Sequence, residues 1–292
     1  MLISVIIPAY NNASNLDKTL ASVYQQTYNN LEIIVVNDCS SDNTTAVIEK
    51  HFDAIKYINL PENKGGSAAR NAGFAESSGE YLAFLDADDM WKPTFIEDQL
   101  SAIEGTSFSA VYCHAEDEIG NVLGGTDQGV FIKELLLGTA DIVSTSALFI
   151  RRKSFVEIGG FDPAFQRHQD LEFVICIMKK GIIGVNPKVL FYKINSASPV
   201  YVKALLGINL FWSKFNEDIN SLSTFDRKWV YAKGKLRLSE LAINQGLWVE
   251  LVKNTLSFIF LNPFVIIPRL RRYIRKALAY FRKDNNRRMP SK

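Results

Sequence analysis

The amino-acid sequence predicts an α/β fold, in which a wound, mainly parallel sheet is flanked by helices and followed by a helical C-terminal extension. Three observations support this class. Apolar, β-branched runs typical of buried parallel strands alternate with segments of helical spacing. Polar clusters follow three of these runs directly, and the chain after about residue 200 has the periodicity of helices.

The alternation is clearest in the first hundred residues. Strands are predicted from LISVIIPAY, LEIIVVND, AIKYINL and GEYLAFLDADD, at residues 2–10, 31–38, 54–60 and 79–89. Helices are predicted between and after them, at residues 14–26, 43–51 and 65–77 and again from Pro93. A βαβαβαβ order of this kind predicts parallel strands joined by right-handed crossovers.

The next hundred residues are less regular. A strand and a hairpin are expected around Gly120, a strand at residues 143–152 and a short helix at Lys153. A loop then leads to a helix over residues 170–180, which Gly181 ends. No internal repeat is present.

Composition is that of a folded intracellular protein. Of the 292 residues, 47% are apolar and 22% charged, which allows a large core. Cys39, Cys113 and Cys176 lie far apart and form no disulfide framework, which favours a reducing compartment. The N-terminus has no basic leader, and no run reaches the ~18 apolar residues of a membrane-spanning helix.

Charge is distributed unevenly along the chain. Residues 269–292 hold ten Lys/Arg and one Asp, a net of +9, while the remaining residues sum to −7. The apolar stretch 255–268 precedes this basic tail but is too short to span a bilayer. Together they are typical of an interfacial anchor on an anionic cytoplasmic leaflet. The alternative is that 255–268 packs on the catalytic domain and the tail is a solvated charged end.

Polar clusters stand where three predicted strands end. PAYNN follows the first strand, NDCSSD the second and DADD the fourth, and ligands bind at the carboxyl ends of such strands. We therefore expect Tyr10, Asp38 and Asp86 to Asp89 to converge on one crevice. Each cluster alone could also be a turn, with Ser40, Ser41 or Asp42 capping a helix.

The third cluster has the character of a metal site. Asp86 and Asp88 project to the same side of an extended chain, and Mg²⁺ or Mn²⁺ typically takes one or two carboxylates plus phosphate oxygens. KGGSAARNAG offers backbone N–H groups at a helix start, near Lys64 and Arg70, although plain helix capping would also explain it. The P-loop, GxGxxG and GxSxG motifs are absent.

Five segments together carry a family resemblance. VIIPAYNN, IIVVNDCSSDNT, NKGGSAARNAG, YLAFLDADDMW and GGFDPAFQRHQDLEF follow one another at family-like spacing. Over about residues 2–195 the chain resembles the family 2 glycosyltransferases, which are inverting enzymes of the GT-A fold that act in bacterial cell-surface glycan synthesis. The resemblance implies a UDP- or dTDP-sugar donor and a divalent metal, Mn²⁺ or Mg²⁺.

The resemblance also implies roles for individual residues. Asp88 would bind the metal, Asp86 would face the ribose or a metal-bound water, and Asp89 could share either role. Asp170, in RHQD, matches the catalytic base, although it could also be the N-cap of its helix. The positions that match donor contacts are Pro8, Ala9, Tyr10, Asn11, Asp38, Asn63, Arg70, Asp86 and Ala87.

The resemblance further implies an organisation and an activity. A GT-A catalytic domain is expected over residues 1–200, with its nucleotide-sugar half at about 1–105 and its acceptor half at about 106–200, followed by a helical region at 201–292. The enzyme would add one sugar to a glycan or lipid-linked acceptor, because the QxxRW motif and membrane spans of processive synthases are missing. The alternatives are a sugar nucleotidyltransferase and a non-catalytic glycan- or partner-binding relative. No nucleic-acid partner is expected.

Overall fold

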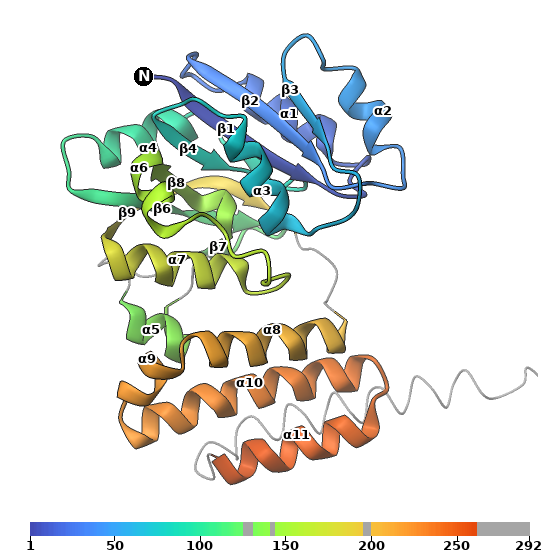
Figure 1. Ribbon diagram of the computed structural model, residues 1–292, viewed down its shortest axis with the longest axis vertical. Coiled ribbons are helices and arrows are strands. Elements are labelled where there is room, and N and C mark those ends of the chain that lie inside the picture. Colours follow the sequence, from blue (N-terminus) through green and yellow to red (C-terminus); the bar gives the residue numbers. More distant parts are fainter. Residues whose placement is uncertain (125–130, 141–143, 195–199, 262–292) are drawn as a thin grey trace, which may run out of the picture. The chain divides into compact units, whose positions relative to one another are not determined.

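The computed structural model describes residues 1–124, 131–140, 144–194 and 200–261 (Figure 1). The chain divides into two compact units, residues 1–196 and 197–292. The first is built around one mixed sheet with the strand order β3-β2-β1-β4-β8-β6-β9-β5, in which β7 also pairs with β6. In the second unit, the described residues 200–261 form helices.

The four strands predicted in the first hundred residues form a parallel half of the sheet. They are β1 (Ile3–Ala9), β2 (Leu31–Asn37), β3 (Lys56–Asn59) and β4 (Tyr81–Phe84). In β1, six of the seven residues are buried, as expected for a central strand covered on both faces. Because β2, β1 and β4 are parallel neighbours, their carboxyl ends meet at one edge.

Strands of later sequence complete the other half, where directions are mixed. They are β5 (Met90–Trp91), β6 (Phe108–Asp117), β7 (Val122–Leu123), β8 (Leu148–Arg151) and β9 (Ile182–Lys193). The predicted hairpin is formed by β6 and β7, and β8 pairs antiparallel with both β4 and β6.

The twelve-residue strand β9 was not predicted. It pairs parallel with β6, but the register jumps from Cys113↔Asn186 to His114↔Val189, which leaves Pro187 and Lys188 without partners in the ladder. Proline has no N–H for a ladder bond and is found in strands mainly at edges and bulges. This interruption hid the strand, which ends at Lys193 beside the acidic cluster.

Helices pack around the sheet and position the later part of the site. They are α1 (Leu16–Tyr24), α2 (Thr44–Glu49), α3 (Gly66–Ala75), α4 (Phe95–Ile103), α5 (Ile132–Leu137), α6 (Arg152–Ile158) and α7 (Gln169–Lys180), with a 3-10 turn at Thr145–Ala147. A buried aromatic cluster connects α7 to the sheet: Phe173 stacks on Phe161 with ring centroids 3.9 Å apart, and both contact Phe84 of β4 edge to face.

The second unit contains α8 (Tyr201–Lys214), α9 (Asn216–Ser221), α10 (Thr224–Asn244) and α11 (Trp248–Leu261). Ser223 caps α10, because its hydroxyl accepts a hydrogen bond from the Asp226 N–H. Six buried side chains of α8 and α10 form the core, Tyr201, Ala204, Ile208, Leu238, Leu241 and Ala242.

The predicted apolar stretch 255–268 is described as far as residue 261. Within it, Phe258 is buried in this unit, whereas Leu256 and Phe260 are exposed. Residues 262–268 and the basic tail 269–292 lie outside the described residues, so the anchor stays a prediction. Among the described helices, none combines the length and apolar content that crossing a bilayer requires.

Candidate active site

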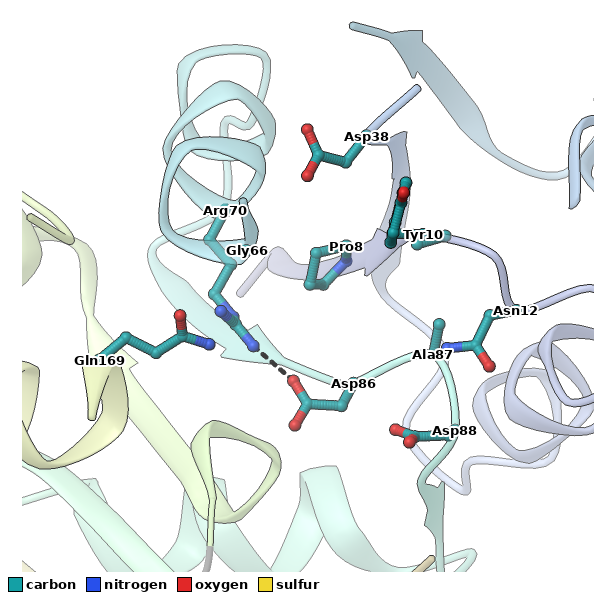
Figure 2. Close-up of a pocket in the computed structure, with 11 residues that line it drawn as sticks. Pro8, Tyr10, Asn12, Asp38, Gly66, Arg70, Asp86, Ala87, Asp88 and Gln169 are labelled. Atoms are coloured by element: carbon teal, nitrogen blue, oxygen red, sulfur yellow. Dashed lines mark hydrogen bonds and ion pairs between the residues drawn. The ribbon is translucent and has the colours of Figure 1, made fainter. Parts of the chain in front are cut away.

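An open pocket of about 210 Å³ lies at the carboxyl ends of β1, β2 and β4 (Figure 2). Its walls come from the segments after these strands, the first turns of α3 and the start of α7. The predicted site residues that line it are Pro8, Ala9, Tyr10, Asp38, Arg70, Asp86, Ala87 and Asp88. Asn12, Gly66 and Gln169 line it too and were not predicted. Predicted residues that do not line it are Asn11, Asn63, Asp89 and Asp170.

The segments after β1 and β2 are joined by hydrogen bonds through Asn11. Its N–H donates to the Ser40 hydroxyl at 3.0 Å, and its side-chain oxygen accepts from the Ser41 N–H at 2.8 Å. Asn11 therefore holds the pocket wall together, and its neighbour Tyr10 presents a half-exposed ring to the pocket.

Asp42 connects the same two segments by hydrogen bonds and also accepts one from the first residue of α2. One carboxylate oxygen accepts from the Ala13 N–H at 3.1 Å, and the other accepts from the Thr44 N–H at 3.0 Å. The N-cap of α2 is Asn43, so the expected cap at residues 40–42 was misplaced. Asp42 nevertheless satisfies a backbone donor of the first turn, which is the physical task of a cap.

Backbone strain is concentrated around the pocket. In the described part of the chain, the non-glycine residues with positive φ are Asn11, Cys39 and His168, at 50°, 58° and 62°. Each directly follows or precedes a residue that lines the pocket. Such conformations cost about 1–3 kcal/mol each and persist where the surrounding structure enforces them, commonly at functional sites.

Asp38 orders the Gly-rich segment that leads into α3. Its two carboxylate oxygens accept hydrogen bonds from the Lys64 N–H at 2.7 Å and the Gly65 N–H at 2.8 Å. The Asn63 side chain donates to the Asp38 carbonyl at 3.2 Å. A carboxylate has about four acceptor positions, so Asp38 keeps capacity for a further donor in the pocket.

Asp86 is the most strongly compensated carboxylate of the acidic cluster. Arg70 forms an ion pair with it, the Thr145 hydroxyl donates to it at 3.2 Å, and the Lys193 ammonium lies 3.7 Å away. Burial would raise the pKa of Asp86, but the charges of Arg70 and Lys193 outweigh burial and lower it. Asp86 is therefore ionised at neutral pH.

Asp89 is completely buried and is bound by the protein itself. The Ser146 hydroxyl donates to it at 2.6 Å, the Lys193 ammonium at 3.1 Å and the Ile194 N–H at 3.2 Å. Burial and the nearby charge of Asp86 raise the pKa of Asp89 to about 7, against the opposing effect of Lys193. With these donors in place, Asp89 fits a structural role better than that of a metal ligand.

Asp88 lines the pocket and differs from both neighbours in its hydrogen bonds. No other residue in the described part of the chain donates a hydrogen bond to its carboxylate, and burial followed by the charge of Asp86 raises its pKa. One ligand oxygen from each of Asp86, Asp88 and Asp89 lies within 4.8 Å of the others. The charges of Lys193 and Arg70 oppose the rise in the Asp88 pKa only in part, so Asp88 beside the ionised Asp86 fits a divalent cation bound through oxygen.

Arg70 has hydrogen-bonding capacity to spare in the pocket. Its side chain is 3% exposed, yet Nε and Nη1 have no hydrogen-bond partner among the described residues, whereas Nη2 donates to Asp86. Buried donors left unpaired cost about 1–3 kcal/mol each, so an acceptor in this pocket would be favoured. A Cβ at Gly66 would lie 2.9 Å from Nη1, so a larger residue there would displace the guanidinium.

The first turn of α7 brings Gln169, rather than Asp170, to the pocket wall (Figure 2). His168 occupies the N-cap position, so the capping role considered for Asp170 was wrong. The Asp170 carboxylate accepts from the Leu171 N–H at 2.9 Å. Glu172 is only 2% exposed, so its side chain lies in the interior.

Thr145, Ser146 and Lys193 are among the partners of the acidic cluster that were missed from the sequence. Thr145 and Ser146 belong to the 3-10 turn before β8, and Lys193 ends β9. Each lies more than fifty residues from the aspartate that it contacts. The polar triplet Ser144-Thr145-Ser146 before an apolar strand was the available signal for the first two.

Solved structures of known proteins share this architecture. S. aureus TarS 1-349 in complex with UDP-GlcNAc matches with a TM-score of 0.60 and 16% identity, over 87% of this chain and 89% of that one. The mannosyltransferase PcManGT from Pyrobaculum calidifontis, in complex with GDP-Man and Mn²⁺, matches with a TM-score of 0.61 and 17% identity, over 95% and 86%. The fold is thus the predicted GT-A fold of glycosyltransferases.

Sequence comparisons narrow this class to one family. The model of glycosyl transferase family 2 matches residues 4–157, more than half of the chain, and the chain belongs to that family. The amylovoran biosynthesis glycosyltransferase AmsB of Erwinia amylovora is 29% identical over 72% of this chain and 75% of its own length.

Two further relatives match smaller shares of their own sequences. An uncharacterised glycosyltransferase of Nostoc is 34% identical over 68% of this chain, and the match covers 66% of that relative. The Escherichia coli protein WfgD is 38% identical over 39% of this chain and 46% of its own length, and is named a UDP-Glc:alpha-D-GlcNAc-diphosphoundecaprenol beta-1,3-glucosyltransferase.

Proposed function

We propose that this chain is an inverting glycosyltransferase that moves one sugar from a UDP- or dTDP-sugar to a hydroxyl of a glycan or lipid-linked acceptor. The observation that supports this most is the convergence of Tyr10, Asp38, Arg70, Asp86 and Asp88 on one pocket. The family match favours this activity over a sugar nucleotidyltransferase, and the complete acidic cluster speaks against a non-catalytic relative.

The donor's nucleotide would lie along the carboxyl ends of β1 and β2. Pro8, Ala9 and Tyr10 form one wall, and the exposed Tyr10 ring can stack on a base. Asp38 would accept from an N–H of the base with the acceptor capacity that its loop contacts leave free. Asn11 and Asn63 would support this wall indirectly, through the hydrogen bonds that order it.

The diphosphate would lie between Arg70 and Asp88. Nε and Nη1 of Arg70, which have no hydrogen-bond partner among the described residues, can donate hydrogen bonds to phosphate oxygens. A hydrogen bond between charged groups is stronger than one between neutral groups. Asp88 and Asp86 would hold Mn²⁺ or Mg²⁺. The bound cation would stabilise the negative charge of the leaving diphosphate. PcManGT, solved with GDP-Man and Mn²⁺, supports a metal in this class of site.

Asp170 is proposed as the general base. The acceptor hydroxyl must lose its proton as it attacks the anomeric carbon, and a single displacement inverts that carbon. Asp170 follows a residue of the pocket wall and lies in the first turn of α7, which the aromatic cluster fixes to the sheet. Residues 1–105 would then mainly bind the donor and residues 106–200 the acceptor.

The acceptor and the location of the enzyme are proposed from the names of its relatives and from its charge. WfgD is named for a diphosphoundecaprenol-linked acceptor, which supports a lipid-linked acceptor for this chain too. The basic tail 269–292 would hold the enzyme on the anionic inner face of the cell membrane, as a peripheral cytoplasmic protein.

A binding screen tests the proposal. Purified protein is heated with a panel of nucleotide sugars, each with and without Mn²⁺, and its melting temperature is recorded. A ligand at about 100 times its dissociation constant stabilises the folded state by about 2.7 kcal/mol, so one UDP- or dTDP-sugar should raise the melting temperature in Mn²⁺. No shift with any nucleotide sugar would contradict the proposal.

A further inference from the structure

An exposed apolar stripe runs along α11. Val249, Val252, Leu256 and Phe260 are exposed by 80%, 58%, 62% and 86%. Their spacing of three, four and four residues places them on one face of a helix. At 1.5 Å per residue the stripe extends over roughly 16 Å.

The opposite face of α11 already has its packing partners. Asn254 and Phe258 are buried, and the Asn254 side chain donates a hydrogen bond to the Tyr201 hydroxyl at 2.8 Å. The same hydroxyl donates to Glu250 at 2.9 Å. The stripe is therefore a second apolar face, which the core of the helical unit does not use.

We infer that the Val249, Val252, Leu256 and Phe260 face of α11 docks on the surface of an anionic lipid bilayer. A helix with one face packed on protein and the other exposed and apolar can bury the latter at the boundary of headgroups and acyl chains. The inference rests on the proposed membrane association and deepens it: the anchor expected from residues 255–268 and the basic tail would begin with a folded helix face, which includes Val249 and Val252 ahead of that stretch.

Charge and chain continuity identify the bilayer as the occupant. The apolar stretch continues in sequence to residue 268, and the next 24 residues hold the net charge of +9. Lys253, with its side chain 69% exposed, lies beside the stripe and 3.9 Å from the Glu250 carboxylate, so the net positive charge comes from the tail rather than from α11. An apolar face followed immediately by clustered cations complements acyl chains beneath anionic headgroups.

A second copy of this chain fits the stripe less well. Stable interfaces engage about 20–30 residues on each partner, and the stripe consists of four side chains. A bilayer needs no shape complementarity and takes a narrow stripe of this length readily.

Co-sedimentation of the full chain with vesicles tests the inference. Phosphatidylcholine vesicles with and without phosphatidylglycerol are compared for the wild type, for Leu256→Ser with Phe260→Ser, and for a chain that ends at residue 268. Serine removes apolar surface without changing charge. Ile119→Ser with Val156→Ser is the matched control, since both residues are apolar, exposed and outside α11.

The double variant Leu256→Ser with Phe260→Ser, here the face variant, should bind anionic vesicles more weakly than the wild type, on the order of tenfold for each side chain removed. The control should bind like the wild type. A face variant that binds as well as the control would overturn the inference. In that event, weaker binding of the shortened chain alone would assign the membrane association to the tail. Binding by no form of the protein would overturn both.

Two further measurements separate membrane docking from unfolding and from dimerisation. Val249→Ser with Val252→Ser removes the other half of the stripe, so the result does not depend on one variant that could unfold. Light scattering without vesicles should give the same mass for all forms of equal length. If the wild type is a dimer and the face variant is a monomer, the stripe is instead the contact surface for a second copy. Nucleotide-sugar binding should be equal throughout, so failure of vesicle binding leaves the donor-site proposal intact.

Discussion

Two carboxylates, Glu32 and Asp88, lie at opposite ends of the parallel strands and have opposite surroundings. At the amino ends of β1 and β2, Glu32 accepts hydrogen bonds from the Ser4 hydroxyl at 2.6 Å, the Gly79 N–H at 2.9 Å and the Lys56 ammonium at 2.8 Å. At the carboxyl ends, Asp88 receives no hydrogen bond from another described residue. One carboxylate is fully supplied with donors, and the other faces a pocket without them.

The pKa values of Glu32 and Asp88 differ in the direction that their hydrogen-bond donors predict. Burial alone would raise the pKa of Glu32, but Lys56, Ser4 and two backbone N–H groups lower it to about 2. For Asp88, burial and the charge of Asp86 both raise the pKa. The comparison teaches that a carboxylate with donors stabilises the fold, whereas one held beside another negative charge without donors is poised to bind a cation.

The largest effect is expected at the pocket edge, from Asp170→Asn. The amide keeps the shape of the side chain but cannot take a proton, so sugar transfer should fall by ~10²–10⁴-fold while donor affinity stays nearly unchanged. Single-turnover transfer and calorimetric titration of the donor measure the two quantities. If the variant keeps most of its transfer rate, the base lies elsewhere, and His168 becomes the next candidate.

The next effect is expected from Lys193→Met, because this substitution removes a cation that the buried Asp89 and the partly buried Asp86 share. Lys193 lies 3.1 Å from Asp89 and 3.7 Å from Asp86. Breaking a buried ion pair typically costs 3–5 kcal/mol, so the free energy of unfolding should fall by about that much. Urea denaturation gives the value, with Lys153→Met, an exposed lysine on α6, as the control. Equal stability of the two variants would mean that Asp86 and Asp89 need no second cation.

A smaller and pH-dependent effect is expected at the other edge, from Glu32→Gln. Hydrogen bonds to a charged group contribute about 1.5–3 kcal/mol, so the variant should be less stable by that amount at pH 7. Because folding lowers the pKa of Glu32 from 4.5 to about 2, its contribution is complete above about pH 4.5 and is lost as the pH falls towards 2. Unfolding curves of wild type and variant should therefore converge at low pH. A difference in unfolding free energy that does not change with pH would show that ionisation of Glu32 does not stabilise the fold.

Local patterns in the sequence were enough to predict one half of the candidate site. β1, β2 and β4 are mainly apolar runs. The polar residues that follow them, Tyr10, Asp38 and Asp86, line the pocket, as expected for residues at the carboxyl ends of parallel strands. The other half depends on pairings across the chain. Lys193 is 104 residues from Asp89, and its strand is broken by Pro187, so neither spacing nor periodicity could reveal the contact.

The most direct measurement is Mn²⁺-dependent binding of UDP, or of the nucleotide selected by the screen, to two variants side by side. Asp88→Ala should lose at least about tenfold in affinity in Mn²⁺, because it removes the carboxylate proposed to hold the metal, yet unfold like the wild type. Glu32→Gln should bind with unchanged affinity and unfold more easily. Unchanged metal-dependent affinity in Asp88→Ala, or a loss shared equally by both variants, would contradict the assignment of the pocket edge to metal and donor binding.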